Sequence, residues 1–264
     1  MLSWIDSHCH LDRYEDPKSV VARARDAGVS AMVAVSTHPD TFEKLVPLTM
    51  EFQDVFASVG LHPCDAETMS VTELRSWLEL GVTKGQKIIA LGETGLDNRP
   101  TSPPLDIQRD AFEEHIRVSI NSGLPLIVHT RNCDDEFLRI MRNVRKTWHG
   151  GTQVRGVLHC FTGSVECAQE AVDWGWKISL SGIVTFKSAP EVHQLARCVP
   201  LNALMLETDA PWLAPVPYRG KVNEPAFVVH TAQAVALLRD CSLSELSQAT
   251  VDATKDLFVG LSQG

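Results

Sequence analysis

The sequence predicts an α/β protein with the architecture of a (β/α)8 TIM barrel and a metal site at the C-terminal face of the barrel. Eight short β-branched and aliphatic runs recur along the chain, with longer amphipathic stretches between most of them. The length of 264 residues suits one barrel, which typically takes about 250 residues. Metal-binding side chains stand at the ends of several runs. We therefore expect a single domain that spans residues 1–264.

The predicted strands are short and aliphatic. They cover residues 4–6, 31–35, 55–59, 88–91, 126–128, 156–158, 177–180 and 203–206. Amphipathic segments predict helices over residues 17–27, 41–52, 108–122, 134–145, 165–174 and 191–198. Residues 226–239 and 243–261 are expected to form terminal helices outside the barrel. Two proline-rich loops, residues 98–105 and 210–225, follow the fourth and eighth strands and are expected at the C-terminal face.

The composition, 44% hydrophobic and 22% charged, is that of an ordinary globular protein. No apolar run approaches the roughly 18 to 20 residues that span a bilayer, and no basic and then apolar leader precedes Asp6. We expect a cytoplasmic protein with no membrane contact and no obligate protein partner. Seven cysteines without a C-x-x-C pair argue against a disulfide framework.

The formal net charge of -9 argues against a global electrostatic attraction for nucleic acid. A polyanionic substrate would therefore need local help from metal ions and a few basic side chains.

The densest chemical signal is the segment Asp6-Ser7-His8-Cys9-His10, where the first strand is expected to end. Because side chains alternate across a strand, His8 and His10 are expected to point into the barrel, with Ser7 and Cys9 pointing outward. Two imidazoles with this spacing can chelate one ion. A His-x-His pair standing alone is more often a pair of hydrogen-bonded polar histidines, so the assignment depends on further ligands.

Further metal-binding or proton-transferring side chains stand at the C-terminal tips of other predicted strands. They are His62, Glu93, His129, His159 and Asp209. Imidazole and carboxylate together suit Zn, Mn, Co or Fe, and Mg where carboxylate and water dominate. Two ions roughly 3.5 to 4 Å apart need a ligand that reaches both, and Glu93, central in the strand order, is predicted to bridge them. The alternative for Glu93 is a buried acid that caps a helix or pairs with an arginine.

Glu207 and Asp209 lie two residues apart and so face the same side of the last strand. We expect Asp209 to bind one metal ion and to accept a proton from the attacking water. Glu207 is expected to orient a neighbouring ligand or to face the substrate, with a purely structural acid as the alternative. His62, near the mouth of the barrel, is placed to hydrogen-bond a substrate oxyanion, or else caps its loop.

Three basic residues lie near these tips. Arg131 follows His129 by two residues, and Arg219 and Lys221 lie in the long last loop. Such groups would clamp a phosphate or a carboxylate, or would simply be solvated. The remaining histidines fall away from strand tips and are assigned no role: His38, His115, His149, His193 and His230.

Seven motifs, running in order from residue 6 to residue 225, together resemble the TatD family of metal-dependent deoxyribonucleases within the amidohydrolase superfamily. They are DSHCHLD (6–12), GLHP (60–63), GETGLD (92–97), LPLIVHTR (124–131), HCFTG (159–163), ETDAP (207–211) and RGKVNEP (219–225). The resemblance covers nearly the whole chain, and the motifs are highly specific when taken together.

The resemblance implies a dinuclear site that hydrolyses phosphodiester bonds in DNA, typically as a 3′–5′ exonuclease. It implies two divalent metal ions per chain, drawn from Mg, Mn, Zn and Co, and DNA, single-stranded or at 3′ ends, as the partner. The ligands that it implies are His8, His10 and Asp209 for one ion, His129 and His159 for the other, and Glu93 as the bridge. Contacts with the substrate phosphate are implied for His62, Arg131, Arg219 and Lys221.

The chain departs from the family pattern at two positions. Asn98 stands where the family commonly has an aromatic residue, which would weaken a stacking contact with a base. Asp256 stands where an asparagine is usual, a change expected to concern packing.

Two other functions remain open at this stage. A small-molecule amidohydrolase or lactonase would share the dinuclear site, and the acidic net charge and Asn98 favour it. A catalytically silent scaffold would keep the barrel, although the complete ligand set argues against that reading.

Overall fold

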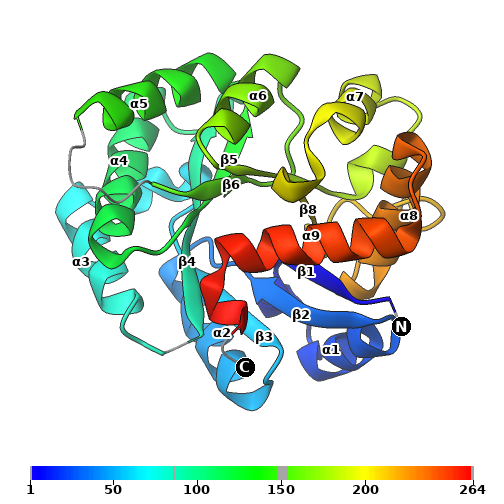
Figure 1. The fold of residues 1–264 in the computed structure, drawn as a ribbon. Coiled ribbons are helices and arrows are strands. Elements are labelled where there is room, and N and C mark those ends of the chain that lie inside the picture. Colours follow the sequence, from blue (N-terminus) through cyan, green and yellow to red (C-terminus); the bar gives the residue numbers. More distant parts are fainter. Residues whose placement is uncertain (1, 86, 148–153, 263–264) are drawn as a thin grey trace.

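The computed structural model describes residues 2–85, 87–147 and 154–262, and in them eight parallel strands form a barrel in the order β1 to β8. An isolated parallel bridge between Cys9 and Ala210 brings the first strand beside the end of the last. Figure 1 shows the strands at the centre of the molecule and the helices around them. The predicted (β/α)8 TIM barrel is confirmed.

The strands have these bounds: β1 Trp4–Cys9, β2 Val29–Ala34, β3 Val55–Val59, β4 Ile88–Asp97, β5 Leu126–Arg131, β6 Gly156–Leu158, β7 Lys177–Leu180 and β8 Leu204–Leu206. All eight predicted strands are present. Three of them, β1, β4 and β5, extend well past their predicted ends, so that His8, Glu93 and His129 lie within strands rather than after them.

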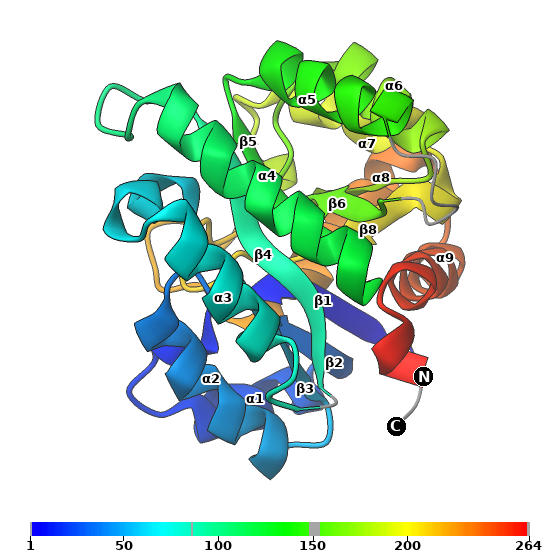
Figure 2. The same ribbon diagram turned by 90° about the vertical axis from the view of Figure 1, so that its left-hand side faces the viewer.

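The helices have these bounds: α1 Pro17–Asp26, α2 Pro39–Glu51, α3 Val71–Gly81, α4 Leu105–Ser122, α5 Asp134–Thr147, α6 Val165–Asp173, α7 Pro190–Cys198, α8 Val228–Arg239 and α9 Leu243–Leu257. Helix α3, which packs along α4 in Figure 2, is absent from the predicted set. Its signal is a capping box, in which the Ser70 and Glu73 side chains each accept a hydrogen bond from the backbone N–H of the other residue. No helix of the described ranges is long and apolar enough to cross a membrane.

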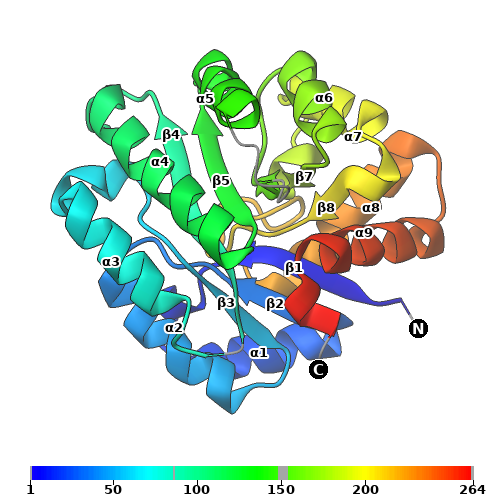
Figure 3. The ribbon, with the colours of Figure 1, turned by 60° about the vertical axis from the view of Figure 1, so that its left-hand side comes forward.

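Two apolar cores hold the barrel together. The larger one lies between the strands and the helices, and the smaller one fills the barrel with inward-facing side chains such as Ile5, Phe56 and Met205. Helix α9 adds Leu257 to the inner core, its C-cap residue adds Phe258, and the short 3-10 helix that follows (Val259–Ser262) adds Leu261. Helix α9 therefore closes the end of the barrel where the strands begin, as Figure 3 shows beside β1 and β8.

Asp256 accounts for one departure from the family pattern. Its carboxylate accepts hydrogen bonds from Arg155 (2.7 Å) and pairs with Lys177 (2.8 Å), at the starts of β6 and β7. An asparagine there would be a neutral partner for two cations. The carboxylate thus ties α9 to the closed end of the barrel, far along the strands from the predicted site.

Strand β1 corrects one expectation about side-chain direction. Ser7 was expected to point outward, but its hydroxyl lies 3.1 Å from that of Ser179 on β7, two strands away around the barrel. The pairing of β1 with β2 is irregular between Asp6 and Cys9. That irregularity breaks the strict alternation, because a bulge lets consecutive residues share a face.

The fourth strand carries a similar irregularity at the centre of the molecule. Its register with β5 shifts between Leu91 and Thr94, around Gly92 and Glu93. The Glu93 N–H donates to the carbonyl of Ser36 (2.7 Å), which fixes the bulged residue across the end of the barrel. A Cβ at Gly60 would overlap the Gly92 backbone, so the loop after β3 can approach this bulge only without a side chain.

Substituting Gly60 tests this close approach. Gly60→Ala is expected to lower the free energy of unfolding by about 1 to 3 kcal/mol or more, because two backbones must separate. Gly85→Ala is the matched control, since that glycine is exposed with open space around it, and it should change stability by less than about 0.5 kcal/mol. Urea unfolding of both variants makes the comparison, and equal stabilities would show that the approach is not restrictive.

Candidate metal centre

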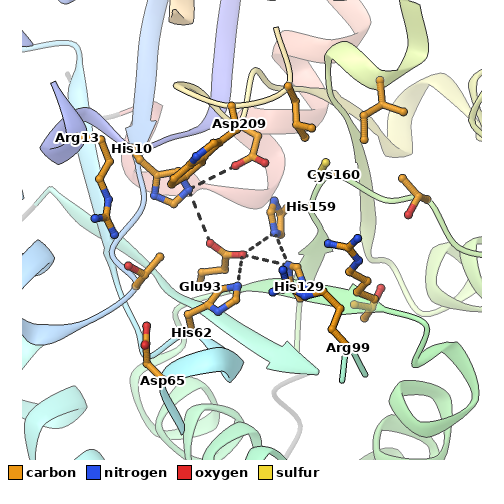
Figure 4. Close-up of a pocket in the computed structure, with 17 residues that line it drawn as sticks. His10, Arg13, His62, Asp65, Glu93, Arg99, His129, His159, Cys160 and Asp209 are labelled. Carbon is orange, nitrogen blue, oxygen red and sulfur yellow. Dashed lines mark hydrogen bonds and ion pairs between the residues drawn. The ribbon is translucent and has the colours of Figure 1, made fainter. Parts of the chain in front are cut away.

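A cavity of about 670 Å³ opens at the C-terminal ends of the strands. Six of the side chains predicted from strand tips line it: His10, His62, Glu93, His129, His159 and Asp209. His8 lies fully buried behind them. The fold thus brings residues that are up to 201 positions apart in sequence, from His8 to Asp209, into one cluster. Figure 4 shows the members of this cluster that line the cavity.

Glu93 occupies the centre of this cluster. Its Oε2 atom faces His8 and His10, at 3.5 and 3.8 Å from their Nε2 atoms. Its Oε1 atom faces the other way, 3.2 Å from Nδ1 of His129 and 2.8 Å from Nε2 of His159. Each carboxylate oxygen therefore meets a different pair of imidazoles, which is the arrangement that a bridging ligand requires.

The first group consists of His8, His10 and Asp209, all with one ligand atom close to the others. The two Nε2 atoms are 3.1 Å apart, and Oδ1 of Asp209 lies 3.7 Å from His8 and 3.4 Å from His10. Ligands about 2.0 to 2.1 Å from a tetrahedral ion are separated by roughly 3.3 Å. The spacing of these three atoms therefore fits one cation between them.

The second group lies on the other side of Glu93. Nδ1 of His129 and Nε2 of His159 are 3.4 Å apart and share contact with the Oε1 atom of Glu93. His62 adjoins this group, with its Nε2 atom 3.3 Å from the same oxygen. The residues of both groups fit a divalent metal ion.

Both carboxylates of the cluster are held in their ionised form. Burial by itself would raise the pKa of Glu93, but the facing His159 and His62, with hydrogen bonds from His129, hold that pKa well below its usual range. Burial likewise opposes ionisation of Asp209, and the hydrogen bond from His10 with the nearby His8 brings its pKa below normal. Both carboxylates are thus negatively charged at neutral pH.

A second layer of side chains fixes the ligands. The Nε2 atom of His129 lies 3.0 Å from Oδ2 of Asp97, which leaves the Nδ1 atom directed at Glu93. Asp97 is held in turn by Arg99 and Ser102. A carboxylate behind a ligating imidazole sets its tautomer and orientation.

Glu207 stands behind His159, although no hydrogen bond joins the two side chains. It is fully buried, and its Oε1 atom lies 3.4 Å from Nδ1 of His159. The side chain does not line the cavity, which removes it from substrate contact and leaves the orienting role as the proposal. Asp6 supports the same strand end, since it accepts hydrogen bonds from the backbone (2.9 Å) and hydroxyl (2.6 Å) of Thr208.

The predicted phosphate contacts divide into two sets. His62 and Arg131 line the cavity, as expected. Arg219 and Lys221 do not line it: the guanidinium of Arg219 stacks on the ring of Phe186 at 4.1 Å, and Lys221 is exposed beside Tyr218. Contact of these two residues with a substrate phosphate stays a prediction, for a part of the substrate outside the cavity.

Several residues that were assigned no role from the sequence also line the cavity. Among them are Arg13, Arg99 and Trp212. Each of these three follows a candidate ligand or its supporting residue within three positions, near the end of β1, β4 or β8. Nearness to a strand tip is therefore a signal in the sequence that could have identified them.

The histidines without an assigned role have other places in the fold. His115 is buried in α4, where its Nε2 atom accepts a hydrogen bond from the Leu61 N–H (3.1 Å) and so steadies the loop that carries His62. His38 caps α2, and His193 lies 3.1 Å from the Val184 carbonyl. His230 packs near Tyr218, and His149 lies outside the described residues.

Comparison with known proteins places this arrangement among metal-dependent hydrolases. Residues 5–259 match the model of the family described as TatD related DNase. The uncharacterized metal-dependent hydrolase YcfH of Escherichia coli K12 is 40% identical over 261 residues, covering 96% of this chain and 95% of YcfH. YabD of Bacillus subtilis 168, also an uncharacterized metal-dependent hydrolase, is 33% identical over 256 residues, covering 96% of this chain and 98% of YabD.

A solved structure has the same fold. The crystal structure of YjjV, a TatD homolog from E. coli K12, superposes with a TM-score of 0.87 at 29% identity. The match covers 97% of this chain and 98% of YjjV.

Substituting Asp97 tests the support of His129. Asp97→Asn is expected to weaken metal binding by about 10- to 100-fold, because the imidazole loses the carboxylate that orients it. Calorimetric titration of the metal-free protein with Mn²⁺ measures the affinity. Asp65→Asn is the control, since Asp65 lines the same cavity but has no side-chain hydrogen bond or ion pair among the described residues. Equal affinities for the two variants would remove Asp97 from this role.

His115 predicts a pH dependence of stability. Burial lowers the pKa of its imidazole to about 4 from the usual 6.5. Between these values the unfolded chain binds a proton that the folded chain does not, so stability is complete above pH 6.5 and falls toward pH 4 by up to about 1.4 kcal/mol per unit. His115→Gln keeps an acceptor for the Leu61 N–H and should lose this slope. Unfolding curves at several pH values compare the two, and parallel pH profiles would contradict the prediction.

Proposed function

This chain belongs to the family of TatD-related DNases, and we propose that it is a metal-dependent hydrolase which cleaves phosphodiester bonds in DNA, working from the 3′ end. The resemblance seen in the sequence motifs is thereby confirmed. The family is one of metal-dependent hydrolases, and the DNA substrate and the direction of digestion are the proposal. We also propose that residues 1–264 act as one catalytic domain with two divalent ions.

The arrangement of Glu93 between two groups of ligands carries this proposal. When bound, divalent cations at these groups would supply Lewis-acid polarisation of a phosphoryl oxygen and an activated water. Asp209 is ionised, lines the cavity and remains partly accessible, so its carboxylate is suited to accept a proton from that water.

The basic side chains of the cavity favour a phosphate over a neutral substrate. Arg13, Arg99 and Arg131 line it, and guanidinium groups match the oxygens of a phosphate in geometry and charge. Arg13 already pairs with Asp12 (3.2 Å) and Arg99 with Asp97 (2.8 Å), so Arg131, which has no ion pair among the described residues, carries the least compensated charge of the three. His62 presents its Nε2 atom beside Glu93 and is placed to donate to a non-bridging oxygen. These groups place basic side chains at the cavity, although the chain as a whole carries a net charge of -9.

The size of the cavity favours the end of a strand. A volume of about 670 Å³ lies within the range of small-ligand sites, which are about 300 to 1,000 Å³. Grooves that bind single strands along their length accommodate roughly 4 to 16 nucleotides. A cavity of this size suits one terminal nucleotide and its scissile bond.

A cleavage assay tests the function directly. Protein stripped with a chelator and resupplied with Mg²⁺ or Mn²⁺ should shorten a 5′-labelled single strand into a ladder, and a blocked 3′ end should prevent this. Asp209→Asn should lower the rate by at least about 100-fold, because the ligand and proton acceptor become neutral. Asp252→Asn is the matched control and should keep the wild-type rate, because this carboxylate lies on α9 and, within the described ranges, accepts side-chain hydrogen bonds from Gln248 alone.

The same assay includes the competing function. A panel of lactones and amides, run beside DNA and an RNA strand of the same sequence, separates a nuclease from a small-molecule amidohydrolase. Metal-dependent hydrolysis of a lactone without any cleavage of DNA would overturn the proposal in favour of that alternative.

A further inference from the structure

Trp212 is an exposed aromatic side chain beside the metal centre. It is 48% exposed, whereas most large apolar side chains of the strands and their loops are buried. Its ring meets the edge of the His10 ring, with centroids 4.9 Å apart and planes at 68°. Trp212 also lines the cavity that holds Glu93 and Asp209. An indole in this position leaves apolar surface open to whatever enters the site.

The backbone holds this indole in place. The Trp212 N–H donates to the carbonyl of Asp209 (3.0 Å), a metal-ligand candidate. The Trp212 carbonyl accepts a hydrogen bond from the side-chain amide of Asn223 (2.6 Å), and Asn223 is fully buried. A fixed aromatic surface binds a flat partner with little loss of conformational entropy.

The cavity has chemically different sides. Trp212 and Leu213 come from the loop after β8, and Ile183 comes from the loop after β7. Arg99 and Arg131 come from the ends of β4 and β5, which are about half a turn away in a ring of eight strands. The ligands of the two metal groups lie between these sides. A matching substrate therefore has a flat apolar part and an anionic part, with the reacting bond between them.

Asn98 does not decide whether the metal cavity has an aromatic surface. It lines a neighbouring hollow with Asn132 and Cys133, and it is not among the residues that line the metal cavity. The absence of an aromatic residue at that position therefore leaves the aromatic surface of the metal cavity intact.

We propose that Trp212 forms a stacking subsite for the base of the terminal nucleotide, with its side chain set against His10 so that the adjoining phosphodiester lies over the metal groups. This inference rests on the proposed function and names the part of the substrate that one residue recognises. The subsite would take any of the bases, because every base offers a flat π-face. Arg99 and Arg131 would hold the phosphates on the opposite side.

The test uses two single strands of identical sequence, one of which carries an abasic tetrahydrofuran residue in place of its 3′-terminal nucleotide. With the metal-loaded enzyme, Trp212→Ala should lower kcat/KM for the complete strand roughly 5- to 100-fold, mainly through KM. The same variant should change kcat/KM for the abasic strand by less than about twofold. Trp212→Phe should retain most of the activity on the complete strand, because phenylalanine keeps a stacking face.

A matched control comes from the same loop. Val222 is 63% exposed and does not line the cavity, so Val222→Ala should leave both strands unaffected. Equal losses on the complete and the abasic strand with Trp212→Ala would show a structural role and overturn the stacking subsite. Unchanged kinetics on both strands would overturn it as well.

A binding measurement separates this inference from the proposed function. Adenosine 5′-monophosphate should quench the tryptophan fluorescence of the metal-loaded wild-type protein, and Trp212→Phe should lose that quenching. If the wild type cleaves no strand but shows this quenching, the nuclease function fails and the base subsite stands. If it cleaves DNA but the quenching is the same in both proteins, the subsite fails and the function stands.

Discussion

The carboxylate of Glu93 is buried at the open end of the barrel, and it stays ionised because imidazoles from four different strands or their loops surround it. An isolated charge in such a place would be strongly unfavourable. The ends of β1, β3, β5 and β6 must therefore converge on β4 within a few ångströms. Only a closed ring of parallel strands directs so many C-terminal ends at one point, so the metal centre and the barrel depend on each other.

The rest of the molecule maintains this convergence. Helix α9 closes the opposite end of the barrel and leaves the C-terminal end open for chemistry. Asp97 and Glu207 stand behind two of the imidazoles, and His115 steadies the loop that carries a third. The polar side chains behind the candidate ligands thus orient the imidazoles and do not contact the substrate. This is expected where the ligands must be held in position before a metal ion binds.

The side chains of the cavity explain how an acidic chain could bind the anionic substrate that we propose. The whole chain is acidic, yet three guanidinium groups line the cavity, and an exposed indole lies across the candidate metal groups from two of them, Arg99 and Arg131. Local fields and shapes decide recognition at short range, because salt screens the distant charges of the surface within about 10 Å. Under the proposed function, the chain would bind the end of an anionic strand without attracting nucleic acid over its whole surface.

The sequence by itself determined the barrel and the set of candidate metal-binding side chains. Eight aliphatic runs predict the eight strands of the barrel. Because the C-terminal ends of parallel strands meet on one face, side chains near those ends are predicted to lie together, and these are His8, Glu93, His129, His159 and Asp209. Only the tertiary structure decided where Ser7 and Glu93 point, because bulges break the alternation of a strand. It also decided that Arg13, Arg99 and Trp212 enter the cavity while Arg219 and Lys221 leave it. The direction of a loop side chain follows from the neighbours against which the loop packs, and those neighbours are distant in the sequence.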